Sequence, residues 1–184
     1  AMTGYPESLT DPSYRGQLLV LTYPLVGNYG VPEGRVGENG IESFFESGSI
    51  HVSGLIISDY TERYSHWNAC SSLGQWLKEE NIPGIYGIDT RTLTRHIREK
   101  GAMPGKIVLE DDKAIEEEPF FDPNAVNLVD EVSTRERIVY GDGQYKILLV
   151  DCGVKNNIIR CLLERDTTVI RVPWDYDFTN EEYH

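Results

Sequence analysis

The chain has 184 residues, of which 40% are hydrophobic and 26% are charged. This composition is typical of a soluble globular protein of one or two domains, with enough apolar material for a core. Acidic residues outnumber basic residues by 30 to 17, and the formal net charge of −13 argues against a nucleic-acid partner. We therefore expect a small molecule or another protein as the partner.

The beginning of the chain predicts loops around one strand. Residues 4–14 are rich in turn formers, with two prolines and no apolar period, and residues 17–23 predict a buried strand. Residues 24–40 hold five glycines and two prolines. Such a long loop indicates either a binding or interface loop or a mobile surface loop.

The next elements alternate between strand and helix. Residues 51–58 have the β-branched apolar content of a strand, and residues 60–70 predict a loop with aromatic anchors. Residues 71–80 predict a helix, because their apolar side chains recur three and four positions apart.

The most regular segment of the sequence is residues 84–101. A short apolar strand leads to Asp89, which predicts a helix cap, and Gly101 stands where the helix should stop. Leu93 and Ile97 share one face of this helix. The helix also carries a basic stripe, which consists of Arg91, Arg95 and Arg98. A capped surface helix with a solvated basic face is the simplest interpretation.

Shorter segments follow. Residues 105–109 predict a strand, residues 110–118 an acidic surface loop, and residues 126–132 and 138–140 weaker strands. Because strands outnumber helices without regular alternation, the first 140 or so residues predict a mixed α/β domain rather than a doubly wound sheet.

The last part of the chain predicts one βαβ unit. Residues 145–151 and 168–173 are continuous apolar strands, and residues 155–165 form an amphipathic helix between them. A single βαβ unit buries too little apolar surface to fold alone. Either it packs on the first domain or the sequence is a fragment of a longer protein, and we favour the fragment.

The cysteines indicate a reducing compartment. They have no CxxC spacing and are odd in number, which suits free thiols in a cytosolic or mitochondrial-matrix protein. The cysteines are Cys70, Cys152 and Cys161. Three histidines, His51, His66 and His96, are expected to be structural residues, since no acid or thiol recurs near them at a metal-binding spacing. No signal peptide or long apolar run is evident, so secretion and membrane spanning have no support.

Four motifs, in order along the chain, resemble one family. They occupy residues 3–14, 21–28, 87–94 and 150–160. Together they closely resemble the small subunit, or glutaminase region, of carbamoyl-phosphate synthetase. Cys152 followed by Gly153, and the segment Val172-Pro173-Trp174-Asp175, look more like the fused eukaryotic synthetases than the bacterial two-subunit enzymes.

The resemblance implies an α/β fold in two parts. Residues 1–143 would form the mixed β/β/α N-terminal domain of the small chain, lacking its first strands. Residues 144–184 would be the first βαβ unit of a truncated, flavodoxin-like class I glutamine amidotransferase domain. The protein partner implied for the first domain is the synthetase portion.

The resemblance also implies a function. The family hydrolyses glutamine and passes ammonia to a synthetase portion, which makes carbamoyl phosphate for pyrimidine, arginine or urea synthesis. Its serine in the Asp-Pro-Ser-Tyr motif contacts glutamine, which assigns glutamine binding to Ser13; a hydroxyl can donate to a carboxylate and accept from an amine. Without the family, Ser13 is equally well explained as a turn-stabilising residue. ATP, bicarbonate and magnesium are expected only in the synthetase portion, with no cofactor or metal in this region.

The implied catalytic machinery is not found in this sequence. The family's nucleophile is a cysteine on a Gly-x-Cys-x-Gly elbow, activated by a histidine that a glutamate orients. No such elbow occurs here, and Cys152 is preceded by Asp151, so Cys152 is predicted not to be the nucleophile. No residue is assigned a catalytic role, and the chain alone is expected to lack glutaminase activity.

Two alternatives remain open. The chain could belong to an ammonia-dependent mitochondrial synthetase, as a non-catalytic regulatory domain in the mitochondrial matrix rather than the cytoplasm. It could also be purely an interaction module that docks on a synthetase partner. Its candidate surfaces would then be residues 34–40 and the basic stripe.

Overall fold

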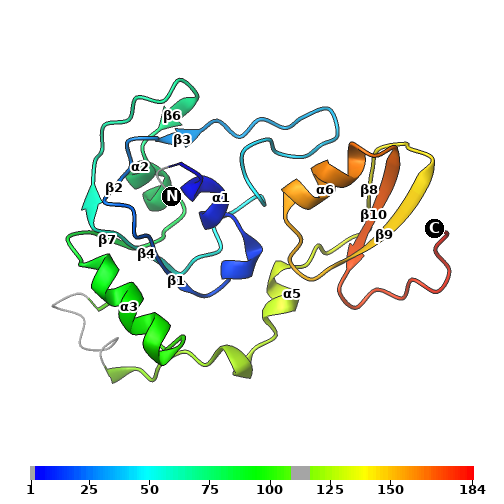
Figure 1. Cartoon of the computed structure of the whole chain (residues 1–184). Coiled ribbons are helices and arrows are strands. Elements are labelled where there is room, and N and C mark those ends of the chain that lie inside the picture. Colours follow the sequence, from blue (N-terminus) through cyan, green and yellow to red (C-terminus); the bar gives the residue numbers. More distant parts are fainter. Residues whose placement is uncertain (1–2, 109–116) are drawn as a thin grey trace.

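The computed structural model describes residues 3–108 and 117–184, which form two lobes side by side (Figure 1). The helices are α1 (Tyr5–Leu9), α2 (Leu73–Glu79), α3 (Thr90–Lys100), α5 (Leu128–Val132) and α6 (Asn156–Leu163), with 3-10 turns η1 (Pro12–Tyr14) and η2 (Pro123–Ala125). The strands of the first lobe are β1 (Leu18–Val20), β2 (Leu25–Val26), β3 (Val31–Pro32), β4 (Gly54–Ile56), β5 (Asp59–Tyr60), β6 (Ala69–Ser71) and β7 (Gly84–Ile85). Those of the second lobe are β8 (Ile138–Tyr140), β9 (Tyr145–Asp151) and β10 (Thr167–Pro173).

The first lobe is built on a parallel three-stranded sheet in the order β1-β4-β7. Two short ribbons accompany it, of which β2–β5 is parallel and β3–β6 antiparallel. Apolar side chains from residues 5–77 pack into one core, and their burial holds the lobe together. The core consists of Tyr5, Leu9, Leu21, Val26, Val31, Ile50, Val52, Leu55, Ile57, Leu73 and Leu77.

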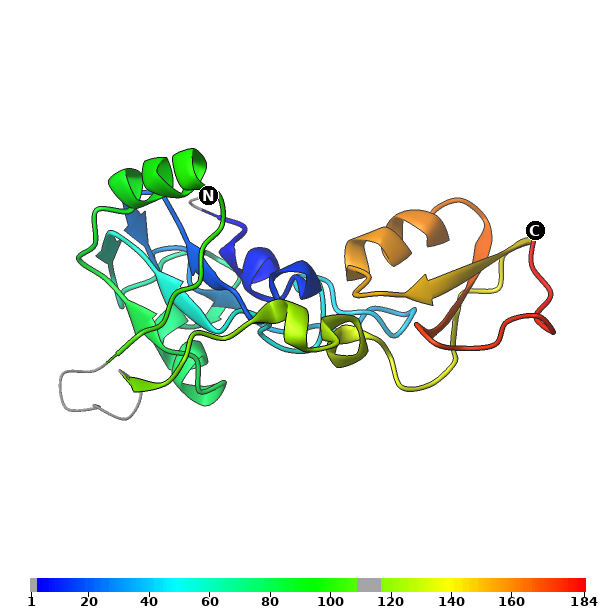
Figure 2. The ribbon, with the colours of Figure 1, turned by 90° about the horizontal axis from the view of Figure 1, so that it is seen from below.

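The second lobe is a three-stranded sheet in the order β8-β10-β9, in which β9 and β10 are parallel and β8 is antiparallel to β10. Helix α6 lies on one side of the strands and the C-terminal segment on the other (Figure 2). Ile159 and Val169 are fully buried between α6 and the sheet. Ile41 from the first lobe joins this cluster, so the two lobes share apolar packing.

Several predicted elements are confirmed. Helix α3 begins after Asp89, whose carboxylate accepts a hydrogen bond from the Thr92 amide at 3.0 Å, and it ends at Gly101 with φ +86°. The predicted βαβ unit is β9-α6-β10, and the helix in residues 71–80 is α2. The fold class is mixed α/β, with both parallel and antiparallel sheets.

The prediction of a strand in residues 126–132 is wrong, because residues 128–132 form α5. Asn127 caps this helix by accepting from the Asp130 amide at 3.2 Å, and the acids Asp130 and Glu131 occupy its first turn. Acidic side chains near a helix N-terminus are stabilised by its unpaired N–H groups. The cap and these charges outweigh the β propensity of the valines.

The strand predicted at residues 105–109 is also wrong over residues 105–108, which are irregular; Leu109 lies outside the described residues. Ile107 packs over the face of the sheet instead of pairing with its edge. A Cβ added to Gly54 would lie 2.8 Å from Ile107 Cδ1, so the glycine makes room for this side chain. The predicted acidic loop falls outside the described residues except for Glu117 and Glu118.

Residues 4–14 contain more regular structure than the predicted turns. They form α1 and η1, and Pro6 is compatible with a helix because it lies in the first turn. The strand predicted in residues 17–23 is shorter, half-buried β1, and the strand in residues 51–58 is reduced to β4. The long loop of residues 24–40 contains only the short strands β2 and β3.

Candidate functional site at the junction of the lobes

Two motifs from opposite ends of the chain meet at the junction of the lobes. Asp11 precedes η1 and Lys155 precedes α6, and the Lys155 ammonium donates to Asp11 Oδ2 at 2.8 Å. Gly153, with φ +97°, lies against Pro12: a Cβ at Gly153 would be 3.2 Å from the Cβ of that proline. We call Asp11, Pro12, Ser13, Gly153 and Lys155 the junction site.

Ser13 is exposed at the junction site, in the middle of η1. Its amide donates to Asp11 Oδ1 at 2.9 Å, and its carbonyl accepts from Gln17 Nε2 at 3.0 Å. The turn is therefore capped by the carboxylate of Asp11 rather than by the hydroxyl of Ser13. The predicted glutamine ligand sits on an anchored backbone and is open to solvent, and its role remains a prediction.

The charge of Asp11 is stabilised although the side chain is only 7% exposed. Burial alone raises the pKa of Asp11, but hydrogen bonds from Lys155 and from the amide and hydroxyl of Ser13 hold it below its usual value. The same contact raises the pKa of Lys155. Both groups of this pair are therefore ionised at neutral pH.

A segment of the first lobe, residues 42–47, caps helix α6 of the second lobe, and we call it the strap. The carbonyl of Glu46 accepts from the Asn156 amide at 2.8 Å, and its Oε2 accepts from the Asn157 amide at 2.9 Å. Thr10 Oγ1 in turn accepts from the Glu46 amide at 2.9 Å. Because the residue before α6 makes no side-chain cap, the first helical N–H groups depend on the other lobe.

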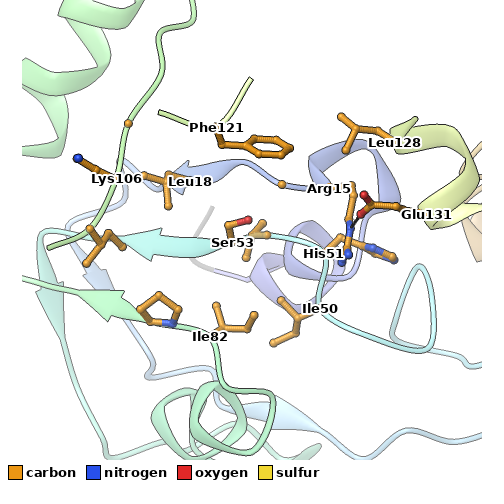
Figure 3. Close-up of a pocket in the computed structure, with 15 residues that line it drawn as sticks. Arg15, Leu18, Ile50, His51, Ser53, Ile82, Lys106, Phe121, Leu128 and Glu131 are labelled. Atoms are coloured by element: carbon orange, nitrogen blue, oxygen red, sulfur yellow. Dashed lines mark hydrogen bonds and ion pairs between the residues drawn. The ribbon is translucent and has the colours of Figure 1, made fainter. Parts of the chain in front are cut away.

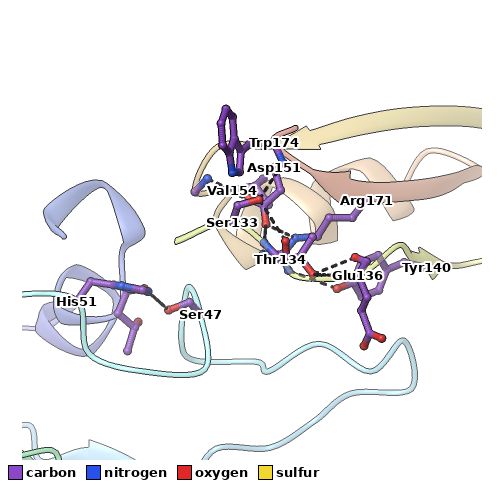
Figure 4. A network of polar contacts seen from close by, with 12 residues as sticks. Ser47, His51, Ser133, Thr134, Glu136, Tyr140, Asp151, Val154, Arg171 and Trp174 are labelled. Atoms are coloured by element: carbon purple, nitrogen blue, oxygen red, sulfur yellow. Dashed lines mark hydrogen bonds and ion pairs between the residues drawn. The ribbon is translucent and has the colours of Figure 1, made fainter. Parts of the chain in front are cut away.

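Asp151, at the end of β9, organises the turn that leads into α6 (Figure 4). It is fully buried and accepts four hydrogen bonds. Oδ1 accepts from the amides of Gly153 and Val154 at 2.9 and 2.8 Å, and Oδ2 accepts from the Thr134 amide at 2.7 Å and Arg171 Nε at 2.8 Å. One carboxylate thus fixes β9, β10 and the segment after α5 relative to one another.

His51 is buried beneath η1, and its Nε2 lies 2.9 Å from Ser47 Oγ (Figure 4). The Ser47 hydroxyl donates its proton to the Thr10 carbonyl at 2.7 Å, so Ser47 accepts from His51. A serine in this arrangement is not activated as a nucleophile, since the histidine does not take its proton. Burial, and after it the charge of Arg15, lowers the pKa of His51.

A largely apolar cavity of about 490 Å³ opens on the first lobe (Figure 3). The ion pair between Arg15 and Glu131, at 2.7 Å, stands at one end of the cavity, and Lys106 stands at the other. Its apolar lining includes Leu18, Ile50, Val52, Ile82, Ile107, Phe121 and Leu128. Ser13 is not among the residues that line it, so the cavity and the junction site are separate.

The predicted docking surfaces lie elsewhere. All three arginines of the basic stripe are exposed on α3, which Figure 1 shows on the side of the first lobe away from α6. Residues 34–40 are exposed as well. The residue after that loop, Ile41, is buried in the core of the second lobe, so one end of the loop is anchored at the junction.

The thiols of Cys70, Cys152 and Cys161 are free. Cys152 is exposed immediately after β9, the strand exit at which the sequence places it. Over residues 3–108 and 117–184, no group of three His, Cys, Asp or Glu side chains could hold a metal ion. Among the described helices, none has the length and apolar character needed to cross a bilayer.

Sequence reasoning missed the ion pair beside Ser13. Asp11 and Lys155 lie in motifs that the sequence singled out, each directly before a helix or turn. Their contact joins positions 144 apart, and no local spacing encodes such a pair. Glu46 had no signal either, because it lies in a segment without periodicity.

Comparison with known proteins gives consistent matches. The model of the family described as "Carbamoyl-phosphate synthase small chain, CPSase domain" matches residues 1–107. The chain is 48% identical to the "Multifunctional protein ura1" of Schizosaccharomyces pombe, over 99% of this chain and 9% of that protein. It is 50% identical to the human "Carbamoyl-phosphate synthase [ammonia], mitochondrial", over 98% of this chain and 12% of that protein. It is also 50% identical to the "Multifunctional protein CAD" of Squalus acanthias, over 99% of this chain and 8% of that protein. The chain thus spans 8 to 12% of the length of these curated relatives.

Proposed function

Because this chain belongs to the carbamoyl-phosphate synthase small-chain family, we propose that it forms part of a glutamine-dependent carbamoyl-phosphate synthetase. Its region would take part in hydrolysing glutamine and supplying ammonia for carbamoyl phosphate, in pyrimidine or arginine synthesis. The synthetase portion is the proposed partner. ATP, bicarbonate and magnesium would bind to that portion, with no cofactor in this region.

We further propose that residues 1–143 are the β/β/α small-chain domain and that residues 144–184 open a class I amidotransferase domain. The parallel β9-α6-β10 unit supports the second assignment, because such a unit is the building block of a doubly wound sheet. Strand β8 lies before the proposed boundary but pairs with β10, so the two domains share one sheet.

The observation that carries the proposal is the position of Ser13. An exposed serine, fixed by its backbone and set beside an ion pair that joins the two lobes, is suited to bind a small polar ligand. Ser13 is therefore our candidate for the glutamine contact.

Glutamine binding can be tested by NMR titration of the whole chain. We expect glutamine to shift the amide signals of Ser13 and Gly153, and Ser13→Ala to weaken binding about fivefold, the typical effect of one hydrogen bond. Ser65→Ala, an exposed serine of the first lobe, is the matched control. Unchanged affinity in Ser13→Ala would contradict the assignment.

Catalysis by this chain alone is not expected, since its sequence contains no Gly-x-Cys-x-Gly elbow. The measurement is ammonia release from glutamine by the purified chain. Turnover that disappears in Cys152→Ala would overturn this expectation and assign the nucleophile to Cys152.

A second candidate function is a non-catalytic interaction or regulatory region of an ammonia-dependent mitochondrial synthetase. The human relative that carries the words "ammonia" and "mitochondrial" in its name is 50% identical, which supports this candidate as much as the 50% identity to the Squalus acanthias CAD protein supports the first. The exposed basic stripe and residues 34–40 would be its docking surfaces. Pull-down with a synthetase portion, together with no calorimetric signal for glutamine, would favour this candidate.

The first candidate implies a cytoplasmic protein, and the second a protein of the mitochondrial matrix.

A further inference from the structure

Among the described residues, Trp67 is the most exposed large apolar side chain, at 83%, and it lies in the loop before β6. We propose that residues 64–68, which we call the aromatic loop, are a docking surface. Trp67 would enter an apolar pocket with a basic rim on the synthetase portion. The identity of this partner rests on the proposed function, whereas the presence of a docking surface does not.

A series of ring contacts anchors Trp67 to the core of the first lobe. Tyr5, which is buried, meets the ring of Tyr29 edge-on, with the ring centroids 5.9 Å apart. The His66 ring lies 4.2 Å from the ring of Tyr29 and 5.5 Å from that of Trp67. The exposed indole therefore rests on a ring that is itself packed against the core.

The backbone of the aromatic loop is held in place as well. The Ser65 amide donates to the Asn28 carbonyl at 3.1 Å, and the Tyr64 hydroxyl donates to the Cys70 carbonyl at 3.2 Å. Asn68, at the end of the loop, is buried. A partner that binds an ordered loop loses less conformational entropy than one that must first order it. An aromatic side chain displayed in this way is suited to be an interface hot spot.

The composition around the aromatic loop is that of an interface core. Residues 64–77 contain no Asp, Glu, Lys or Arg, although 26% of the whole chain is charged. The cores of protein interfaces are depleted in charged residues and enriched in aromatic residues. Tyr64, which is 39% exposed, adds a second aromatic ring to this surface.

Two exposed acids border the aromatic loop and indicate the charge of the partner. Glu62 lies two residues before the loop, and Glu33 follows the residue of β3 that pairs with β6. Basic side chains around the pocket of the partner would complement these carboxylates. A second copy of this chain is a poorer partner, because each copy has a formal net charge of −13 and the copies repel each other.

The synthetase portion is the partner that the comparisons favour. The chain spans only 8 to 12% of its curated relatives, so most of such a protein lies outside the matched region and is available for contact. Figure 1 shows β3 and β6 at the opposite end of the first lobe from α3. The aromatic loop and the basic stripe are therefore separate surfaces, and substitutions can test them one at a time.

The experiment measures the affinity of the whole chain for the synthetase portion of the same protein, expressed as a separate polypeptide, by isothermal titration calorimetry. Trp67→Ala should weaken binding about thirtyfold, the loss typical of an interface hot spot, and Trp67→Phe should restore most of the affinity. Because Trp67 is exposed, both variants should unfold at the same temperature as the unmodified chain. Trp174→Ala, which removes a 39% exposed tryptophan of the second lobe, is the matched control and should bind normally.

The basic rim is tested with the double variant Glu33→Gln and Glu62→Gln. This variant should bind more weakly than the unmodified chain at low salt, and its affinity should depend less on salt concentration. Tighter binding by the double variant would show that the rim of the partner is not basic and would overturn that part of the proposal.

The remaining outcomes separate this proposal from the proposed function. Unchanged affinity in a folded Trp67→Ala chain, with binding lost in Arg95→Ala, would assign docking to the basic stripe and overturn the proposal alone. An unmodified chain that binds no synthetase portion would overturn both the proposed function and the partner. A dimer of the chain in sedimentation that Trp67→Ala dissociates would assign the aromatic loop to self-association and overturn the partner.

Discussion

Asp151 is a fully buried carboxylate that joins several segments of the second lobe. A buried carboxylate is tolerated only when hydrogen bonds and a counter-charge replace water, and here three backbone amides and Arg171 do so. Because these donors belong to four separate positions in the chain, loss of the carboxylate leaves several buried N–H groups unpaired.

We therefore expect Asp151→Asn to lower the free energy of unfolding by about 3 kcal/mol, as found when one partner of a buried ion pair is removed. Urea unfolding monitored by fluorescence provides the measurement. Asp175→Asn changes an exposed acid on the same lobe and should leave stability within about 0.5 kcal/mol. Equal effects of the two substitutions would show that the buried carboxylate of Asp151 does not stabilise the fold more than an exposed acid does.

His51 gives the molecule a defined pH dependence. Its pKa in the folded chain lies below the ordinary value of about 6.5, because burial and Arg15 disfavour the cation although Asp11 opposes them. Between the two pKa values the unfolded chain binds a proton that the folded chain does not. Stability should therefore fall as the pH drops through about 6.5, and level off below the folded pKa.

Unfolding measured from pH 8 to pH 5 tests this dependence. His51→Gln should flatten the curve, whereas His96→Gln, on the exposed face of α3, should reproduce it. If both variants retain the same slope, the dependence comes from other groups.

Single residues were predictable where a local pattern reports their role. The cap at Asp89 is visible in the sequence because cap and helix are adjacent. The role of Asp151 is not visible, since its partners include Thr134 and Arg171 from distant segments. An acid at the end of an apolar strand is equally compatible with exposure.

At the scale of elements, α6 is a helix whose N-terminus is completed by another lobe. Glu46 places both a carbonyl and a carboxylate at the first amides of α6. A carboxylate in this position stabilises a helix through hydrogen bonding and through the helix dipole.

We expect Glu46→Ala to destabilise the chain by about 1 kcal/mol, the usual cost of losing a helix cap. Hydrogen exchange should accelerate at Asn157, whose amide loses its acceptor. Glu38→Ala is the control, because Glu38 lies in the exposed part of the preceding loop. No change at Asn157 would contradict the capping role.

The elements that were predicted correctly and those that were not differ in what stabilises them. Helices α2 and α3 carry their own caps at Ser72 and Asp89, so sequence alone defines them. Residues 126–132 are rich in valine and suggest a strand, but no strand within residues 3–108 and 117–184 pairs with them, and the Asn127 cap favours α5. Ile107 was assigned to a strand from its apolar character, yet it packs on Gly54 across the face of the sheet.

At the scale of the whole molecule, the lobes are coupled by few contacts. These are the ion pair between Asp11 and Lys155, the strap on α6, and the burial of Ile41 in the second core. Polar contacts of this kind couple two folding units only while both partners are present.

We expect the unmodified chain to unfold in one calorimetric transition, and the double variant Glu46→Ala with Lys155→Met to unfold in two. The reason is that the double variant removes the carboxylate cap and the ion pair, which leaves the backbone carbonyls of the strap on Asn156 and Arg160 and the apolar packing around Ile41. A double variant of Glu38→Ala with Lys146→Met, which changes the same charges away from the junction, should retain one transition. Two transitions in the unmodified chain would contradict the coupling.

The sequence predicted both halves of the molecule but not their arrangement. The βαβ unit follows from apolar periodicity within some 30 residues. The junction site requires contacts such as Asp11 to Lys155 and Glu46 to Asn157, which have no periodic signature. Only the resemblance to a family brought Ser13 forward as a site residue.

The capping of α6 by the strap has a consequence for protein engineering. A chimera that joins residues 144–184 to a foreign first domain would expose the first turn of α6 without an acceptor for its amides. Grafts should therefore transfer residues 42–47 as well, or install a serine or aspartate in place of Lys155 so that the helix supplies its own cap. The second choice also removes the ion pair with Asp11. A transplant of this kind would therefore fit other first domains more easily but would lose this contact between the lobes.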